Sequence, residues 1–177
     1  MKTFYPKIAL LFLLIFSFSA QAQENCTQFT KTSDILLNLQ LGMTAEEVTN
    51  KIGKNLGIKT NKKDDYRFFQ NYINKKPPQN LTGVRAIYLR FFEKKLYQLE
   101  IFYDENKYPS DLKNFSEVAS TQLNLSVADW KIAHRQAVFK CGDVSLEIDY
   151  QLNPRVELTN EPIQKQVDEI NKKKKLF

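Results

Sequence analysis

The chain has 177 residues, with 26 Lys and Arg against 20 Asp and Glu, and it contains one His and two Cys. This length and a hydrophobic content of 42% fit one globular domain with a buried core, and they exclude a chain that is disordered throughout. One His and two Cys exclude a zinc cluster built from those ligands, and no glycine-rich phosphate loop is present. We therefore predict that the protein holds no metal and no cofactor.

The first 22 residues have the features of a cleaved secretory signal peptide. Lys2 and Lys7 form a basic start, residues 8–18 form an apolar stretch, and residues 20–22 form a small-residue cleavage site. The apolar stretch is shorter than the roughly 20 residues needed to cross a bilayer. We expect the mature chain to begin at Gln23, to have no transmembrane segment, and to be periplasmic or secreted.

Cys26 and Cys141 are expected to form a disulfide. Two cysteines in an oxidising compartment most often pair, and the chain-entropy model gives a bridge over a loop of about 115 residues roughly 4 to 5 kcal/mol. Residues 23–25 separate Cys26 from the cleavage site, which argues against a lipid anchor on this cysteine. A catalytic thiol is the alternative to the disulfide.

A helix is expected to begin at Thr44. A short apolar segment at residues 35–41 comes first, and Gly42 breaks it. Thr44 and Glu47 have the spacing of a capping box, in which the side chain of each residue accepts a hydrogen bond from the backbone N–H of the other. Gly53 supplies the stop, so the predicted helix has about ten residues.

Residues 66–76 combine aromatic rings with basic side chains, between a polar run at 54–65 and a rigid Pro77-Pro78 corner. Part of this group is expected to be a strand with alternate rings in the core, and the other rings to form a contact surface. The basic residues would steer an acidic protein partner toward that surface. The predicted partner-binding residues are Tyr66, Arg67, Phe68, Phe69, Tyr72, Lys75 and Lys76.

The middle of the chain predicts a β-hairpin. Residues 84–92 and 96–103 are rich in β-branched and aromatic residues, and a loop of hairpin length separates them. Apolar side chains alternate along both segments, which indicates an antiparallel sheet with one buried face and one wet face.

The second half of the chain repeats the order of helix and then strands. Ser110-Asp111 is expected to cap a helix whose apolar face lies on the sheet. Three more strands are predicted at residues 137–141, 144–150 and 155–159, and an amphipathic helix at residues 162–175.

The predicted architecture is α+β: short N-terminal helices packed on an antiparallel sheet, with a C-terminal amphipathic helix. The order of elements suggests two weakly similar α-then-β units. The predicted division is a signal peptide at residues 1–22, a single α+β domain at 23–160 and a C-terminal helix with a lysine-rich tail at 161–177.

Positive charge is concentrated in this tail. Apart from the two lysines of the signal and the four of the tail, the chain carries 20 basic and 20 acidic residues, so no basic stripe for nucleic acid is indicated. The tail lysines are a solvated helix end that complements the helix dipole or, alternatively, a weak contact with an anionic surface. They are Lys172, Lys173, Lys174 and Lys175.

The segment from Leu39 to Gly53 resembles the LxxGMTxxEVxxxLG signature of the SmpA/OmlA (BamE-like) family of small envelope lipoproteins. The matching residues are Gly42, Met43, Thr44, Glu47, Val48 and Gly53. β-Lactamase-inhibitor-protein-like domains have a similar arrangement of helices followed by an antiparallel sheet. The resemblance implies that these residues turn the chain into its helix, and that the protein is bacterial and binds a partner protein of the cell envelope without catalysis.

Two functions follow from these observations. The first is a non-enzymatic, exported binding protein, inhibitor-like or an accessory of assembly, that uses a sheet face and neighbouring loops. The alternative is a small secreted hydrolase with His134 as its base, which would require a cleft with converging polar groups. The sequence favours the first, because it supplies a single His next to Arg135 and singles out no carboxylate pair.

Overall fold

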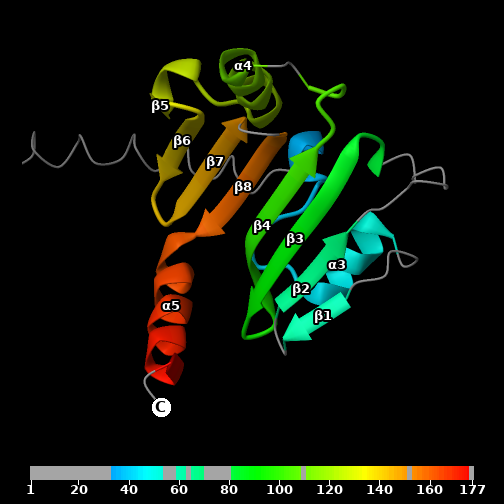
Figure 1. Cartoon of the computed structure of the whole chain (residues 1–177), viewed down its shortest axis with the longest axis vertical. Helices are drawn as coiled ribbons and strands as arrows, with labels where there is room; N and C mark the ends of the chain where they lie inside the picture. Colours follow the sequence, from blue (N-terminus) through cyan, green and yellow to red (C-terminus); the bar gives the residue numbers. More distant parts are fainter. Residues whose placement is uncertain are drawn as a thin grey trace, which may run out of the picture.

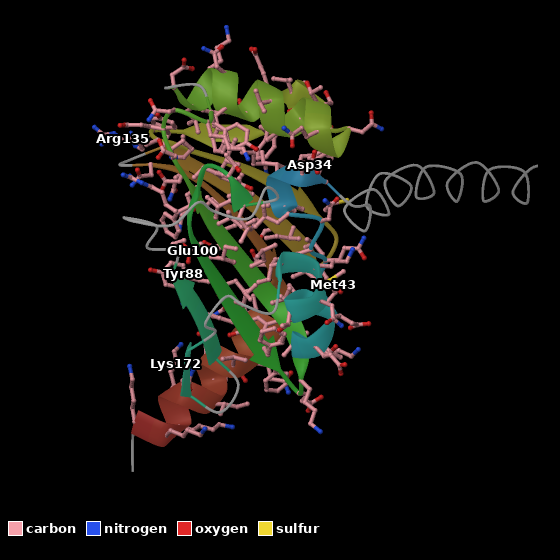
Figure 2. The ribbon with its side chains drawn as sticks, turned by 90° about the vertical axis from the view of Figure 1, so that its right-hand side faces the viewer. Asp34, Met43, Tyr88, Glu100, Arg135 and Lys172 are labelled. Atoms are coloured by element: carbon pink, nitrogen blue, oxygen red, sulfur yellow. The ribbon has the colours of Figure 1, made fainter. Side chains whose placement is uncertain are left out.

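The computed structural model describes residues 33–53, 59–62, 65–69, 81–108, 111–150 and 153–175. Within these residues, eight strands form one antiparallel sheet in the order β1-β2-β3-β4-β8-β7-β6-β5 (Figure 1). The described helices that precede the strands lie against one face of the sheet (Figure 2). None of these helices covers the opposite face, which we call the open face. The predicted α+β class is confirmed. The signal peptide predicted at residues 1–22 lies outside the described residues.

The elements have the following bounds. The helices are η3 (Asp34–Leu36), α3 (Ala45–Ile52), α4 (Leu112–Leu123), η5 (Val127–Asp129) and α5 (Glu161–Lys175). The strands are β1 (Lys59–Lys62), β2 (Asp65–Phe69), β3 (Val84–Phe92), β4 (Lys95–Tyr103), β5 (Lys131–Ala133), β6 (Gln136–Cys141), β7 (Val144–Tyr150) and β8 (Pro154–Asn160).

Helix α3 begins with the predicted capping box. The hydroxyl of Thr44 accepts a hydrogen bond from the Glu47 backbone N–H at 3.2 Å, and the Glu47 carboxylate accepts one from the Thr44 backbone N–H at 2.7 Å. Gly42, at φ +85°, has the positive φ that glycine adopts readily. Its N–H donates to the carbonyl of Leu96 at 2.7 Å, and the Leu96 N–H donates to the carbonyl of Met43 at 2.8 Å. The turn before the helix is therefore fixed to the start of β4.

The hairpin of β3 and β4 supplies the centre of the core. Its alternating apolar residues are buried as predicted, among them Ile87, Leu99 and Ile101, each with no exposed surface. The hydroxyl of buried Tyr103 donates to the carbonyl of Ile35 at 2.7 Å, which ties η3 to the end of β4. Of the apolar segment at residues 35–41, only the first two residues belong to the short 3-10 helix η3, and the leucines and isoleucine up to Leu39 are buried.

Helix α4 packs on the second half of the sheet, against β6 and β7. Asp111 caps it by accepting a hydrogen bond from the Asn114 N–H at 2.8 Å, and Phe115 and Ala119 are buried on its inner side. Trp130 follows η5 and is also buried, with its indole N–H donating to Ser120 at 2.7 Å.

The strand order joins two antiparallel meanders at the middle of the sheet. The first runs from β1 to β4 after α3, and the second from β5 to β8 after α4. The last strands of the two, β4 and β8, pair with each other, with Glu100 opposite Glu157. This is the order of two α-then-β units that the sequence suggests.

Helix α5 continues directly from β8 and projects beyond the end of the sheet (Figure 1). The Asn160 side chain accepts a hydrogen bond from the Ile163 N–H at 3.1 Å and caps the helix start. No residue of α5 is fully buried, whereas its apolar stripe, Ile163, Val167 and Ile170, is partly buried. Among the described residues, no helix combines the length and the apolar character needed to cross a bilayer.

Candidate functional site

The open face of the sheet carries a row of three glutamates on neighbouring strands. Glu147 on β7 is opposite Glu157 on β8, and Glu157 is opposite Glu100 on β4. We call these three residues the glutamate row. Like charges directly opposite each other destabilise a sheet, so this row needs compensation from its surroundings.

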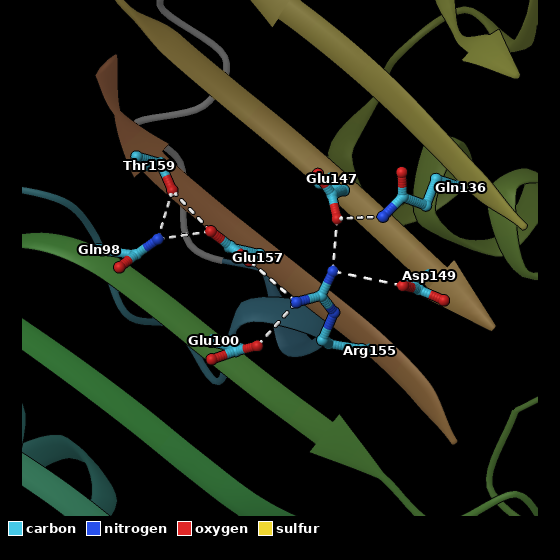
Figure 3. A network of polar contacts seen from close by, with 8 residues as sticks. All are labelled: Gln98, Glu100, Gln136, Glu147, Asp149, Arg155, Glu157 and Thr159. Atoms are coloured by element: carbon cyan, nitrogen blue, oxygen red, sulfur yellow. Dashed lines mark hydrogen bonds and ion pairs between the residues drawn. The ribbon is translucent and has the colours of Figure 1, made fainter. Parts of the chain in front are cut away.

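Arg155 lies at the centre of the acidic residues (Figure 3). Its Nη1 donates to Glu100 at 2.8 Å and to Glu157 at 3.1 Å. Its Nη2 donates to Glu147 and contacts Asp149 at 3.4 Å. Four carboxylates thus share one guanidinium, which leaves a formal excess of three negative charges.

No carboxylate in this network receives the paired N–H bonds of a bidentate arginine contact, since each is bonded to one guanidinium nitrogen. Neutral side chains supply further donors. Gln98 and Thr159 donate to Glu157, and Gln136 donates to Glu147 at 3.2 Å. Among the described residues, the buried oxygens Asp149 Oδ1 and Gln98 Oε1 have no hydrogen-bond partner.

The network is partly withdrawn from water. The side chain of Arg155 is 19% exposed and that of Asp149 is 10% exposed. Desolvation raises the pKa of Glu147 above its ordinary value, more than the attraction of Arg155 lowers it, and the neighbouring acids raise it further. Desolvation lowers the pKa of Arg155, but the bond to Glu100 and the charges of the surrounding glutamates outweigh it and leave that pKa raised. The negative charge is therefore held where solvent screens it incompletely.

Aromatic side chains border the network on the side of β3. Tyr88 is opposite Glu100, and Phe102 is opposite Arg155. The two rings contact edge to face, with centroids 5.5 Å apart. Both are partly exposed, so the open face combines fixed charges with accessible aromatic area.

The predicted partner-binding segment is only partly described. Residues 66–69 belong to β2, so the predicted strand is confirmed. Tyr66 and Phe68 are opposite the buried residues Leu89 and Ile87, whereas Arg67 and Phe69 are opposite Tyr88 and Ala86 of the open face. The other three residues of the prediction, Tyr72, Lys75 and Lys76, lie outside the described residues. Contact by this segment stays a prediction.

His134 lies in the tight turn between β5 and β6. It is exposed and has a φ of +54°. In the described part of the chain, no hydrogen bond joins it to a carboxylate, and the hollow beside it is lined by Ala133, Arg135 and Gln136 without a nucleophile. The described residues therefore add no support for the hydrolase alternative, which stays a prediction.

Of the predicted disulfide pair, Cys141 is buried at the end of β6 and is not a free thiol, and Cys26 lies outside the described residues. The four tail lysines are exposed in the last turn of α5. Within the described ranges, no group of three or more His, Cys, Asp and Glu has an arrangement that could hold a metal ion.

The glutamate row and Arg155 were not among the predicted site residues. The signal was present, because Glu147, Glu157 and Glu100 each alternate with buried apolar neighbours along their strands. Alternation shows that each residue faces the wet side but cannot show that β4 pairs with β8, about 57 residues later in the chain.

No protein-family model matches this chain, and neither a curated protein nor a solved structure is detectably similar to it.

Proposed function

We propose that this protein is an exported envelope protein of a bacterium that binds another protein through the open face of its sheet, without catalysis. The observation that carries the proposal is the one-sided cover of the sheet. The described helices that precede the strands lie against the other face (Figure 2), while the open face presents a network of fixed charges (Figure 3). The ring pair Tyr88 and Phe102 lies beside this network in the strand register. Partly buried aromatic rings next to organised polar groups are typical of protein interfaces.

Export and pairing of the cysteines belong to the same proposal. The signal-like residues 1–22 support a periplasmic or secreted location. A bridge between Cys26 and Cys141 is supported by the even number of cysteines and by the absence of a free thiol at Cys141. The likeness of residues 39–53 to the SmpA/OmlA signature supports an inhibitor-like or assembly-accessory role. The exposed lysines of α5 would add a weak contact with an anionic surface.

The test compares two double variants of the mature protein, tagged and incubated with envelope extract of the organism. The variant Tyr88→Ala with Phe102→Ala truncates the ring pair of the open face. The control, Val127→Ala with Ile132→Ala, truncates two apolar side chains that are 46% and 54% exposed near the edge strand β5. Melting temperatures establish that both variants fold.

The proposal predicts that the proteins retained by the wild type are retained by the control and lost from the open-face variant, by tenfold or more in amount. If the open-face variant keeps these proteins and the control loses them, the binding site lies at the β5 edge instead.

A further inference from the structure

We propose that the partner of this protein inserts an arginine or lysine side chain into the glutamate row, beside Tyr88. This inference rests on the proposed function and adds the chemistry of the partner. It is carried by the excess of negative charge at the centre of the open face.

The excess of negative charge follows from the strand register. A single guanidinium serves Glu100, Glu157, Glu147 and Asp149, and each of these carboxylates contacts only one of its nitrogens. A second cation would complete the hydrogen bonding of carboxylates that Arg155 engages on one side only. Three glutamates in direct register are an arrangement that stability alone does not favour, and such arrangements are expected where a protein binds a ligand.

The register row continues from Glu100 through Tyr88 to Arg67 of β2, so the basic residue that shares this row is one strand beyond Tyr88. In the described part of the face, Arg90 is opposite Gln98, in the next row of the register. Lys140 is opposite Ser145 and pairs with Glu161 at 3.3 Å. Arg155 compensates only part of the negative charge at the centre of the face, and positive charge lies around it, an arrangement that complements a protruding basic side chain.

The surroundings fit a cation better than they fit a neutral group. The ring of Tyr88 is opposite Glu100, so a cation placed against Glu100 has an aromatic ring beside it. Aromatic faces attract arginine and lysine, and a partly desolvated carboxylate strengthens that attraction. Asp149, 7% exposed, adds a buried oxygen that has no partner among the described residues.

The test uses a display library of random linear peptides of twelve residues, selected on the mature protein. The inference predicts selected sequences with an arginine or lysine at one fixed position. Replacing that arginine by citrulline, which has a similar shape without the charge, should weaken binding at least tenfold. Backbone amide shifts on peptide titration should be largest in β4, β7 and β8.

A variant with Glu100→Gln, Glu147→Gln and Glu157→Gln should also weaken binding at least tenfold. Its control carries Glu46→Gln, Glu105→Gln and Glu117→Gln, three exposed glutamates away from the open face, so both variants change the net charge equally. The control should bind within twofold of the wild type. If the triple variant of the row does not fold, the single variant Glu100→Gln replaces it, with an expected loss of at least threefold.

The outcomes separate the two proposals. Selected peptides that map to the open face but lack a fixed basic residue, or that bind both triple variants equally, would overturn this inference and leave the proposed function standing. Peptides that map to another surface, or a selection that yields no binder, would overturn both.

Discussion

Glu100 and Glu157 lie directly opposite each other in the strand pair that joins the two halves of the sheet, and Nη1 of Arg155 donates to both carboxylates, at 2.8 Å and 3.1 Å. Two like charges thus meet at the seam of the fold, held by one guanidinium. Since Arg155 is itself on β8, the same contacts that compensate the charge also connect β8 with β4 and β7.

Replacing Arg155 by Met should destabilise the protein by about 2 kcal/mol at pH 7, because four carboxylates lose their shared counter-charge. This loss of stability relative to the wild type should be smaller at pH 4, because protonation of the carboxylates removes their repulsion. Urea unfolding at the two pH values measures both effects. Arg135→Met, at an exposed position in the β5–β6 turn, is the control and should change stability by less than about 0.5 kcal/mol. An equal loss of stability at both pH values would contradict the idea that Arg155 stabilises the fold by compensating these charges.

Glu147 should make the protein less stable as the pH rises through its raised pKa. Desolvation raises the folded-state pKa of Glu147 above the ordinary value of 4.5, so its contribution to stability is present below that value and is lost at higher pH. The free energy of unfolding of Glu147→Gln, relative to wild type, should therefore improve from pH 4 to pH 7.

The variant Asp104→Asn should show a pH dependence of stability opposite to that of Glu147→Gln. The backbone N–H of Asn106 holds the pKa of Asp104 below its ordinary value, so this carboxylate stabilises the fold at neutral pH and less so in acid. The free energy of unfolding of Asp104→Asn, relative to the wild type, should therefore fall as the pH rises. If the relative stability of Glu147→Gln instead falls as the pH rises, as that of Asp104→Asn does, the pKa of Glu147 is not raised.

The capping box of α3 should contribute measurably to stability. Thr44→Ala removes the hydroxyl that accepts the Glu47 N–H, and we expect a loss of about 1 kcal/mol in chemical denaturation. Thr44→Ser keeps this acceptor and should stay within a few tenths of a kcal/mol of the wild type. A serine variant as unstable as the alanine variant would assign the loss to the missing methyl group instead.

Cys26 and Cys141 should both be oxidised in the exported protein. Thiol titration of the denatured, non-reduced protein is expected to find no reactive sulfhydryl, and reduction should release two. Reduction should also lower the melting temperature, because the bridge closes a long loop in the unfolded chain. Two reactive thiols before reduction would show that the cysteines are not paired.

Much of the fold follows from local patterns in the sequence. The period-two alternation of β3 and β4, the capping box at Thr44 and the cap at Asp111 predict their elements because each pattern depends on nearby residues. Strand β1 was missed because its four residues, Lys59–Lys62, are polar throughout. Strand β5 was missed because its three residues are all exposed and show no alternation.

The candidate site was harder to predict for a different reason. Glu100, Glu147 and Glu157 stand in three separate segments, and each is an ordinary polar residue of an alternating strand. Only the pairing of β4 with β8 and of β8 with β7 brings them into one row. The sequence instead predicted a contact surface at residues 66–76, where aromatic and basic residues are adjacent along the chain.

Site-specific photo-crosslinking in the living organism tests most directly whether the open face is the binding surface. A photoreactive phenylalanine analogue is placed at position 88 on the open face and, as the reference, at position 117 on the exposed side of α4. We expect a discrete adduct with another protein from position 88, abolished by Glu100→Gln with Glu157→Gln, and no such adduct from position 117. A discrete adduct from position 117 alone, with none from position 88, would contradict binding through the open face.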